Sequence, residues 1–181
     1  MPTRAPLALS LAVALAGCAA GSSGSSQPSA RVVAPSVSTT LIDAEGKDVG
    51  TASIVQSSFG GVLVLKLTGL PPGPHGLHVH SVGSCEPPAF TSAGPHLNPE
   101  DHQHGARNPK GPHLGDLPNI TARPDGNVDT TLTLRAELLK PGIIGSGANA
   151  RALVVHAKAD DEMTDPSGNS GDRIACGVLQ R

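Results

Sequence analysis

Aromatic side chains are almost absent from this chain of 181 residues, which contains only Phe59 and Phe90 and neither Trp nor Tyr. Any core must therefore be built from Val, Leu, Ile and Ala, and no aromatic surface is available on which nucleic-acid bases could stack. A strong charge is also absent, because 13 Lys and Arg residues accompany 15 Asp and Glu residues. Without a basic patch, we expect no nucleic-acid partner.

The chain also lacks an apolar run long enough to span a bilayer. Its N-terminus instead pairs a positive charge at Arg4 with a short apolar stretch, 7–16, which is typical of a signal peptide. The segment ends in Leu15-Ala16-Gly17-Cys18, which resembles a bacterial lipobox, a motif in which the Cys is lipidated and becomes the first mature residue. The alternative is an ordinary signal peptide that happens to contain a Cys.

We therefore expect a lipoprotein signal peptide at 1–17, a flexible Ser- and Gly-rich linker at 18–35, and one folded domain at 36–181. This organisation predicts an exported protein of the bacterial cell envelope, facing the periplasm or the surface. It would contact the membrane only through a lipid anchor on Cys18.

Cysteine is scarce, and Cys85 and Cys176 are the only ones that remain beyond Cys18. Two distant cysteines in an exported domain indicate a disulfide bond. A pair of metal thiolates is the alternative.

Long helices are disfavoured by 22 Gly and 17 Pro residues. What the chain has instead is a series of short strand patterns separated by tight turns. These patterns favour an all-β fold, an eight-stranded Greek-key barrel or sandwich with immunoglobulin-like architecture. We expect strands at 37–43, 49–57, 62–68, 76–80, 119–123, 127–134, 152–156 and 174–179. In the third strand, 62–68, we expect both faces to be buried, because Val62 and Val64 alternate with three leucines.

The segment 83–118 shows no periodicity, although it carries many histidines. A loop of this length within a compact domain is uncommon unless it is functional. Since it cannot stabilise itself by apolar burial, a disulfide and a metal ion are expected to hold it.

Histidines occur in two groups. The alternation in Gly76–His80 places His78 and His80 on one strand face and Leu77 and Val79 on the other. A further strand ends at His156, and strand-held imidazoles suit copper. The long loop supplies three imidazoles and one carboxylate, a set that fits a tetrahedral zinc site, in His96, His104, His113 and Asp116.

Several longer motifs then occur in a fixed order: HGLHVH at 75–80, GSCEP at 83–87, SAGPHLNP at 92–99, HLGDL at 113–117, LVVH at 153–156 and RIACG at 173–177. Together they resemble the copper/zinc superoxide dismutases of the bacterial exported type. The resemblance covers the chain from about Val37 to its C-terminus.

The resemblance implies a role for each matching residue. Copper would be bound by His78, His80, His96 and His156, and zinc by His96, His104, His113 and Asp116, so that His96 bridges the two metals. Asp160 would orient ligands of both metals, Arg173 would attract the anionic substrate, and Cys85 would pair with Cys176.

The implied activity is dismutation of superoxide to dioxygen and hydrogen peroxide, with one redox-cycling copper and one structural zinc per chain, protecting the cell envelope. His96 would supply the proton. The alternatives are a non-catalytic copper- and zinc-binding lipoprotein of the same fold, and a purely structural β-sandwich. Either a homodimer or a monomer is compatible with the sequence.

Other polar residues are expected outside the site. His75 is expected to be a hydrogen-bonded core histidine, and His102 to be solvated, although it is the one rival to His104 for zinc. The family's substrate-steering charges have no clear match between Asp160 and Arg173, and Lys158 and Lys110, which lie outside this segment, are candidates to replace them. The segment 87–91 also varies in the family.

Overall fold

The computed structural model describes residues 1, 36–57 and 60–181. Contacts between residues divide the chain into two units, Met1–Arg31 and Val32–Arg181, and every strand described below belongs to the second unit. The predicted lipidation site Cys18, the linker at 18–35 and the signal peptide apart from Met1 lie outside the described residues. No helix among the described residues is long and apolar enough to cross a membrane.

Eight β-strands and three short 3-10 helices make up the second unit, and its described residues contain no α-helix. The all-β prediction is therefore confirmed. The strands are β1 Val37–Asp43, β2 Asp48–Ser57, β3 Gly60–Leu67, β4 Gly73–His80, β5 Asp116–Ala122, β6 Val128–Leu134, β7 Arg151–His156 and β8 Arg173–Leu179. The 3-10 helices are η1 Thr91–Ala93, η2 Ala136–Leu139 and η3 Gly147–Asn149.

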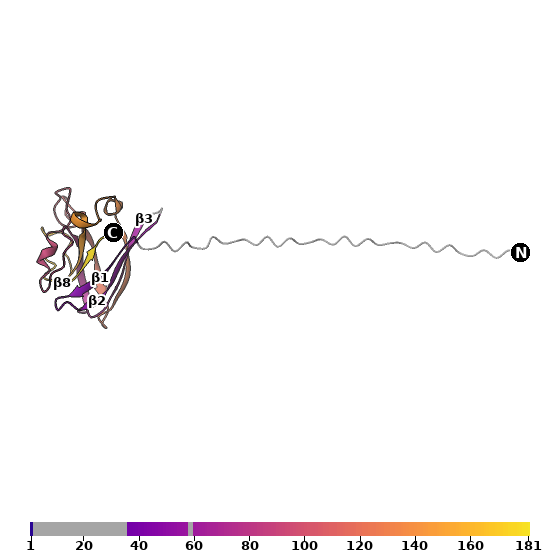
Figure 1. Ribbon diagram of the computed structural model, residues 1–181, viewed down its shortest axis with the longest axis horizontal. Helices are drawn as coiled ribbons and strands as arrows, with labels where there is room; N and C mark the ends of the chain where they lie inside the picture. The colour runs from indigo at the N-terminus through magenta and orange to yellow at the C-terminus, as the bar shows by residue number, and fades with distance from the viewer. Residues whose placement is uncertain (2–35, 58–59) are drawn as a thin grey trace. The chain divides into compact units, whose positions relative to one another are not determined.

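All neighbouring strands are antiparallel, and their order is β5-β4-β7-β8-β1-β2-β3-β6. The two edge strands, β5 and β6, approach each other without a ladder, so that the sheet forms a nearly closed barrel. Figure 1 shows β1, β2 and β3 running alongside one another, with β8 beside β1. The step from β3 to β4 crosses between distant parts of the sheet, as the predicted Greek-key topology requires.

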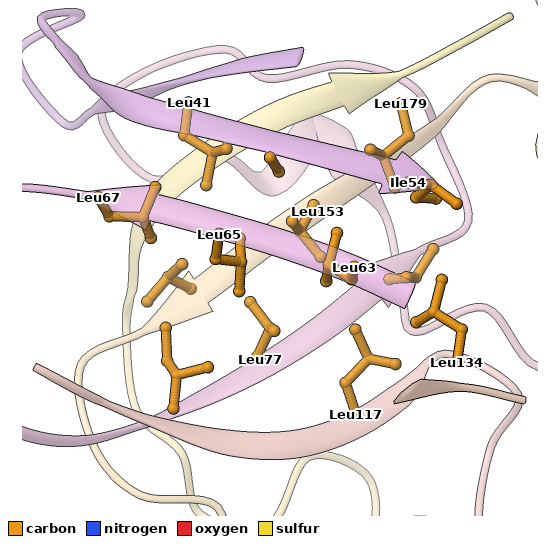
Figure 2. Packing of buried hydrophobic residues seen from close by; sticks show 14 of the residues in the cluster. Leu41, Ile54, Leu63, Leu65, Leu67, Leu77, Leu117, Leu134, Leu153 and Leu179 are labelled. Carbon is orange, nitrogen blue, oxygen red and sulfur yellow. The ribbon is translucent and has the colours of Figure 1, made fainter. Parts of the chain in front are cut away.

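The barrel interior is aliphatic, as the lack of aromatic residues dictates. Leu63, Leu65 and Leu67 point inward from β3 and are almost completely buried. Figure 2 shows them facing Leu77 of β4 and Leu153 of β7 across the core. Burying a leucine side chain stabilises a fold by about 1.5–3 kcal/mol, so this layer holds β4 and β7 firmly against β3.

The other face of β3 differs from the prediction. Val62 and Val64 are only half-buried, and Lys66 is exposed, where it forms an ion pair with Asp129 (3.6 Å). The expectation that both faces of this strand are covered is therefore wrong. In an antiparallel barrel one face of each strand lines the core, while the opposite face can meet solvent.

A second, smaller cluster lies outside the barrel, where part of the predicted long loop covers β7 and β8. Phe90, Ala93, Ala152, Val154 and Cys176 form it, and all five are fully buried. The disulfide between Cys85 and Cys176 ties the same loop to β8, so the predicted pairing is confirmed. The loop is shorter than predicted, because β5 already begins at Asp116.

Candidate metal centre

Four buried histidines converge where β4 and β7 lie side by side. His78 and His80 project from β4, and His156 ends β7, the neighbouring strand. His96 comes from the long loop, which an isolated β-bridge between His96 and His80 attaches to β4. One nitrogen from each of the four rings lies within 4.8 Å of the others. The alternation of β4 therefore has the predicted effect, because Leu77 on its other face is in the core.

The three strand-borne histidines each use one ring nitrogen to donate a hydrogen bond to a fixed acceptor. The bonds are His78 Nε2 to Asp160 Oδ2 (2.7 Å), His80 Nδ1 to the Gly94 carbonyl (2.8 Å) and His156 Nδ1 to the Gly171 carbonyl (3.1 Å). Because carboxylates and carbonyls only accept, these bonds set the tautomer and leave a lone pair on the opposite nitrogen.

Those opposite nitrogens have no hydrogen-bond partner, although they are buried. They are Nδ1 of His78 and Nε2 of His80 and His156. A buried polar atom without a partner is costly, and three of them converging on one point is exceptional. A metal ion coordinated by imidazole nitrogen would satisfy all three at once, so the residues present fit such an ion.

The electrostatics of this group favour neutral rings. Burial lowers the pKa of His78 to about 4, against the opposing effect of its hydrogen bond to Asp160. Burial, followed by the charge of His96, lowers the pKa of His80 to about 2, and burial together with His78 lowers that of His156 to about 3. All three rings are therefore unprotonated near neutral pH, as a metal ligand must be.

A second cluster surrounds the carboxylate of Asp116. The Nδ1 atoms of three histidines lie within reach of its two oxygens: His96 at 2.9 Å from Oδ1, His113 at 3.3 Å from Oδ1 and His104 at 3.1 Å from Oδ2. His113 Nδ1 is also 3.4 Å from His96 Nδ1. These three nitrogens and the carboxylate lie close enough together to serve as the four ligands of a tetrahedrally coordinated ion.

A different set, His78 with His96, His104 and Asp116, also has ligand atoms within 4.8 Å of one another. We place His113 rather than His78 in the second cluster, because the Nδ1 of His113 faces both Asp116 and His96 directly. The Nε2 of His78 is occupied by Asp160, and its Nδ1 belongs to the first group. His96 is common to both groups.

Hydrogen bonds and charge hold the second cluster together. The backbone N–H groups of Gly105 and His113 donate to Asp116 Oδ2 (2.9 and 3.0 Å). Burial opposes ionisation of Asp116, but hydrogen bonds from His104 and His96 outweigh it and hold its pKa below the usual range. Burial would also lower the pKa of His104, yet the carboxylates of Asp116 and Asp160 raise it to about 9, so a metal ion that binds Nδ1 would have to displace a proton.

Asp160 connects the two clusters. Its Oδ2 accepts from His78 Nε2 (2.7 Å) and its Oδ1 accepts from His104 Nε2 (2.9 Å). Asn119 of β5 holds this carboxylate in place by bonding both backbone groups of Asp160, as donor to the carbonyl (2.9 Å) and acceptor from the N–H (2.8 Å). Sequence reasoning missed Asn119, since nothing in a strand asparagine indicates a partner 41 residues away.

Gly168 leaves room for this connection. A Cβ at its position would lie 1.7 Å from Asp160 Oδ1 and 2.7 Å from His104 Nε2. Its backbone also has a positive φ of 61°, which favours glycine.

Arg173 begins β8 beside the first group. Its Nη1 donates to the Phe90 carbonyl (2.7 Å) and its Nη2 to the Gly94 carbonyl (2.8 Å), the same oxygen that receives His80. With His96 and His156 it lines a cleft of about 450 Å³. This cleft gives a small molecule a route to the first group.

The remaining polar residues lie outside both groups. His75 is buried, with its ring between the carbonyl oxygens of His156 (2.8 Å) and Pro71 (2.7 Å). His102 is exposed, 3.1 Å from the Pro112 carbonyl. Lys158 and Lys110 are exposed as well.

Comparisons with known proteins all indicate the same family. The sequence profile of copper/zinc superoxide dismutase (SODC) matches residues 49–179. "Superoxide dismutase [Cu-Zn] 2" of Aquifex aeolicus is 42% identical over 143 residues, covering 77% of this chain and 84% of that protein. "Superoxide dismutase [Cu-Zn]" of Deinococcus radiodurans is 41% identical over 163 residues, covering 81% and 85%.

Solved structures agree. The crystal structure of a superoxide dismutase-like protein from Bacillus subtilis matches with a TM-score of 0.73 at 40% identity, covering 78% of this chain and 97% of that one. The copper/zinc superoxide dismutase from Brucella abortus matches with a TM-score of 0.65 at 33% identity, with the same coverage.

Proposed function

The chain belongs to the copper/zinc superoxide dismutase family, and we propose that it converts superoxide to dioxygen and hydrogen peroxide in the cell envelope. The observation that carries the proposal is the set of three buried, unpartnered imidazole nitrogens that point at one site beside a cationic cleft. A structural domain would have no use for such nitrogens, because they lower its stability.

We assign copper to His78, His80, His96 and His156, and zinc to His96, His104, His113 and Asp116, with one ion of each per chain. Asp160 orients a ligand of each ion through its two hydrogen bonds. When bound, copper would supply one-electron redox chemistry, and zinc would be a structural ion that holds the loop.

The protein's own residues then handle the substrate. The guanidinium of Arg173 attracts the superoxide anion into the cleft, at a rate that falls with ionic strength. His96 Nδ1 faces Asp116, so its Nε2 is the atom that can carry the proton that the peroxide product needs.

The principal test is His78→Ala. It removes one unpartnered nitrogen while leaving the disulfide and the Asp116 cluster, so we expect dismutation to fall at least about 100-fold with the fold retained. The assay is stopped-flow decay of superoxide, with copper and zinc content measured on the same samples. A wild-type protein that binds both metals without turnover would instead support the non-catalytic metal-binding lipoprotein.

We also propose that the domain is exported and anchored through a lipid on Cys18, after a signal peptide at 1–17 and through the linker at 18–35. The disulfide supports export, because such bonds persist in oxidising compartments. We expect Cys18→Ser to shift the protein from the membrane to the soluble fraction and to abolish labelling by a radioactive fatty acid. Unchanged membrane partitioning of the variant would contradict the anchor. A homodimer and a monomer both remain compatible with this proposal.

A further inference from the structure

Phe90 has an unusual backbone for so large a residue. It precedes the one-turn helix η1 with φ 52° and ψ 27°, in the left-handed region. Left-handed geometry is unfavourable for side chains that carry a Cβ, and it persists only where the surrounding structure imposes it. Residues held in this way occur most often at functional sites, so what Phe90 contacts is informative.

The side chain of Phe90 anchors the loop. It is fully buried in the smaller cluster, where its neighbours include Ala152 and Val154 of β7 and Cys176 of β8. Ala93, at the other end of η1, is buried in the same cluster. Both ends of this single turn are therefore fixed to the strands that carry His156 and Arg173.

The backbone of the same turn holds Arg173. The Phe90 carbonyl accepts from Nη1 (2.7 Å), and the Gly94 carbonyl accepts from Nη2 (2.8 Å). The planar fork of a guanidinium spans two such acceptors with little loss of side-chain freedom. Gly94 also accepts from His80, so the turn fixes the arginine relative to the copper site that we propose.

The two acceptors are neutral. Among residues 36–57 and 60–181, no carboxylate lies within 4.0 Å of the guanidinium of Arg173. The carbonyls therefore hold the cation without cancelling its charge, which stays available to an anion in the cleft.

We propose that Phe90 is a positioning residue for anion binding: its buried ring holds a left-handed turn whose carbonyl aims Arg173 at the cleft. The inference deepens the proposed function and rests on it, because Arg173 matters only if an anion approaches the metal. The segment 87–91 thus contains a component of the site.

The test measures anion affinity rather than turnover. Azide is titrated into the Cu(II)-loaded protein and its dissociation constant is obtained from visible absorption, for wild type, Phe90→Leu and Phe90→Ala, each with copper content verified. We expect binding to weaken progressively from Leu to Ala, by about three- to tenfold in Phe90→Ala. In an Arg173→Gln background the same substitution should have no further effect.

Ile54→Ala is the matched control, because Ile54 is almost as deeply buried but lies on β2, which β1 and β8 separate from β7 and β4 in the sheet. It should lower stability while leaving azide affinity unchanged. Equal azide affinity in wild type and the Phe90 variants would overturn the proposal, as would equal weakening with and without Arg173. If Phe90→Ala does not fold, Phe90→Leu decides by the same comparison. Failure of the proposed function would be recognised by a different result, because the wild-type protein would then not catalyse dismutation.

Discussion

The two histidine clusters reach similar compactness by different means. In the first, strand register places His78, His80 and His156, and the rings are neutral, each with one ring nitrogen that lacks a hydrogen-bond partner. In the second, a loop residue, His104, and a charged carboxylate, Asp116, contact each other directly. The first cluster therefore depends mainly on strand pairing, with His96 added from the loop, whereas the second depends on its own charges. This difference matches the roles that we propose: the first cluster would hold the redox-active copper, and the second would stabilise the loop.

The largest expected effect comes from removing the charge at the centre of the second cluster. In the metal-free protein, we expect Asp116→Ala to lower the free energy of unfolding by about 3 kcal/mol, because it leaves two buried N–H donors and His104 without their acceptor. His80→Ala, in the first cluster, should cost only about 1 kcal/mol. Urea denaturation measures both.

Asp125→Ala is the control, since Asp125 is exposed at a hairpin turn and should change stability by less than about 0.5 kcal/mol. Equal losses from Asp116→Ala and His80→Ala would remove the proposed distinction between the clusters.

An intermediate effect is expected at the connection between them. Asp160→Asn keeps the shape of the side chain, but it can no longer accept from both His78 and His104 as a charged group. Affinity for both metals should fall about 10- to 100-fold, as it does when such supporting carboxylates are changed. Competition with a chelator measures each metal. If only one affinity changes, Asp160 belongs to one cluster alone.

The smallest effect per residue, about 1.4 kcal/mol per pH unit for each titrating histidine, is expected in the pH dependence of metal-free stability. The unfolded chain protonates His78, His80 and His156 near pH 6.5, but the folded chain does so only near 4, 2 and 3, so stability falls as pH drops below 6.5. His104 has a raised pKa of about 9, so its contribution is fully present below pH 6.5 and is lost as pH rises through 9.

The acid side of the plot of stability against pH should therefore depend on the first cluster, and the alkaline side on the second. Thermal unfolding across pH should show His80→Gln flattening the acid limb and His104→Gln flattening the alkaline limb. A variant that flattens the opposite limb would contradict the pKa assignments.

Much of this arrangement could be predicted from the sequence. Period-two alternation located β1 at its observed bounds and most other strands to within a few residues. The candidate ligands lie near one another, with His113 next to Asp116 and His96. Burial of the outer face of β3 could not be predicted, because it depends on what covers the barrel. Asn119 and the Gly94 carbonyl were missed for a related reason, because the partners of both are set by tertiary proximity and not by residue type.

The register between β4 and β7 has a consequence for the order of folding. It brings together His78 and His156, which the chain supplies far apart, and Asp160 bonds His78 across 82 positions. Contacts between such distant segments form late, because closing a long loop costs entropy before the contact can repay it. The first cluster can therefore form only after β7 has paired with β4 and the segment that follows β7 has returned to His78. Native geometry of these imidazoles thus reports that the long-range pairing of β4 with β7 is complete.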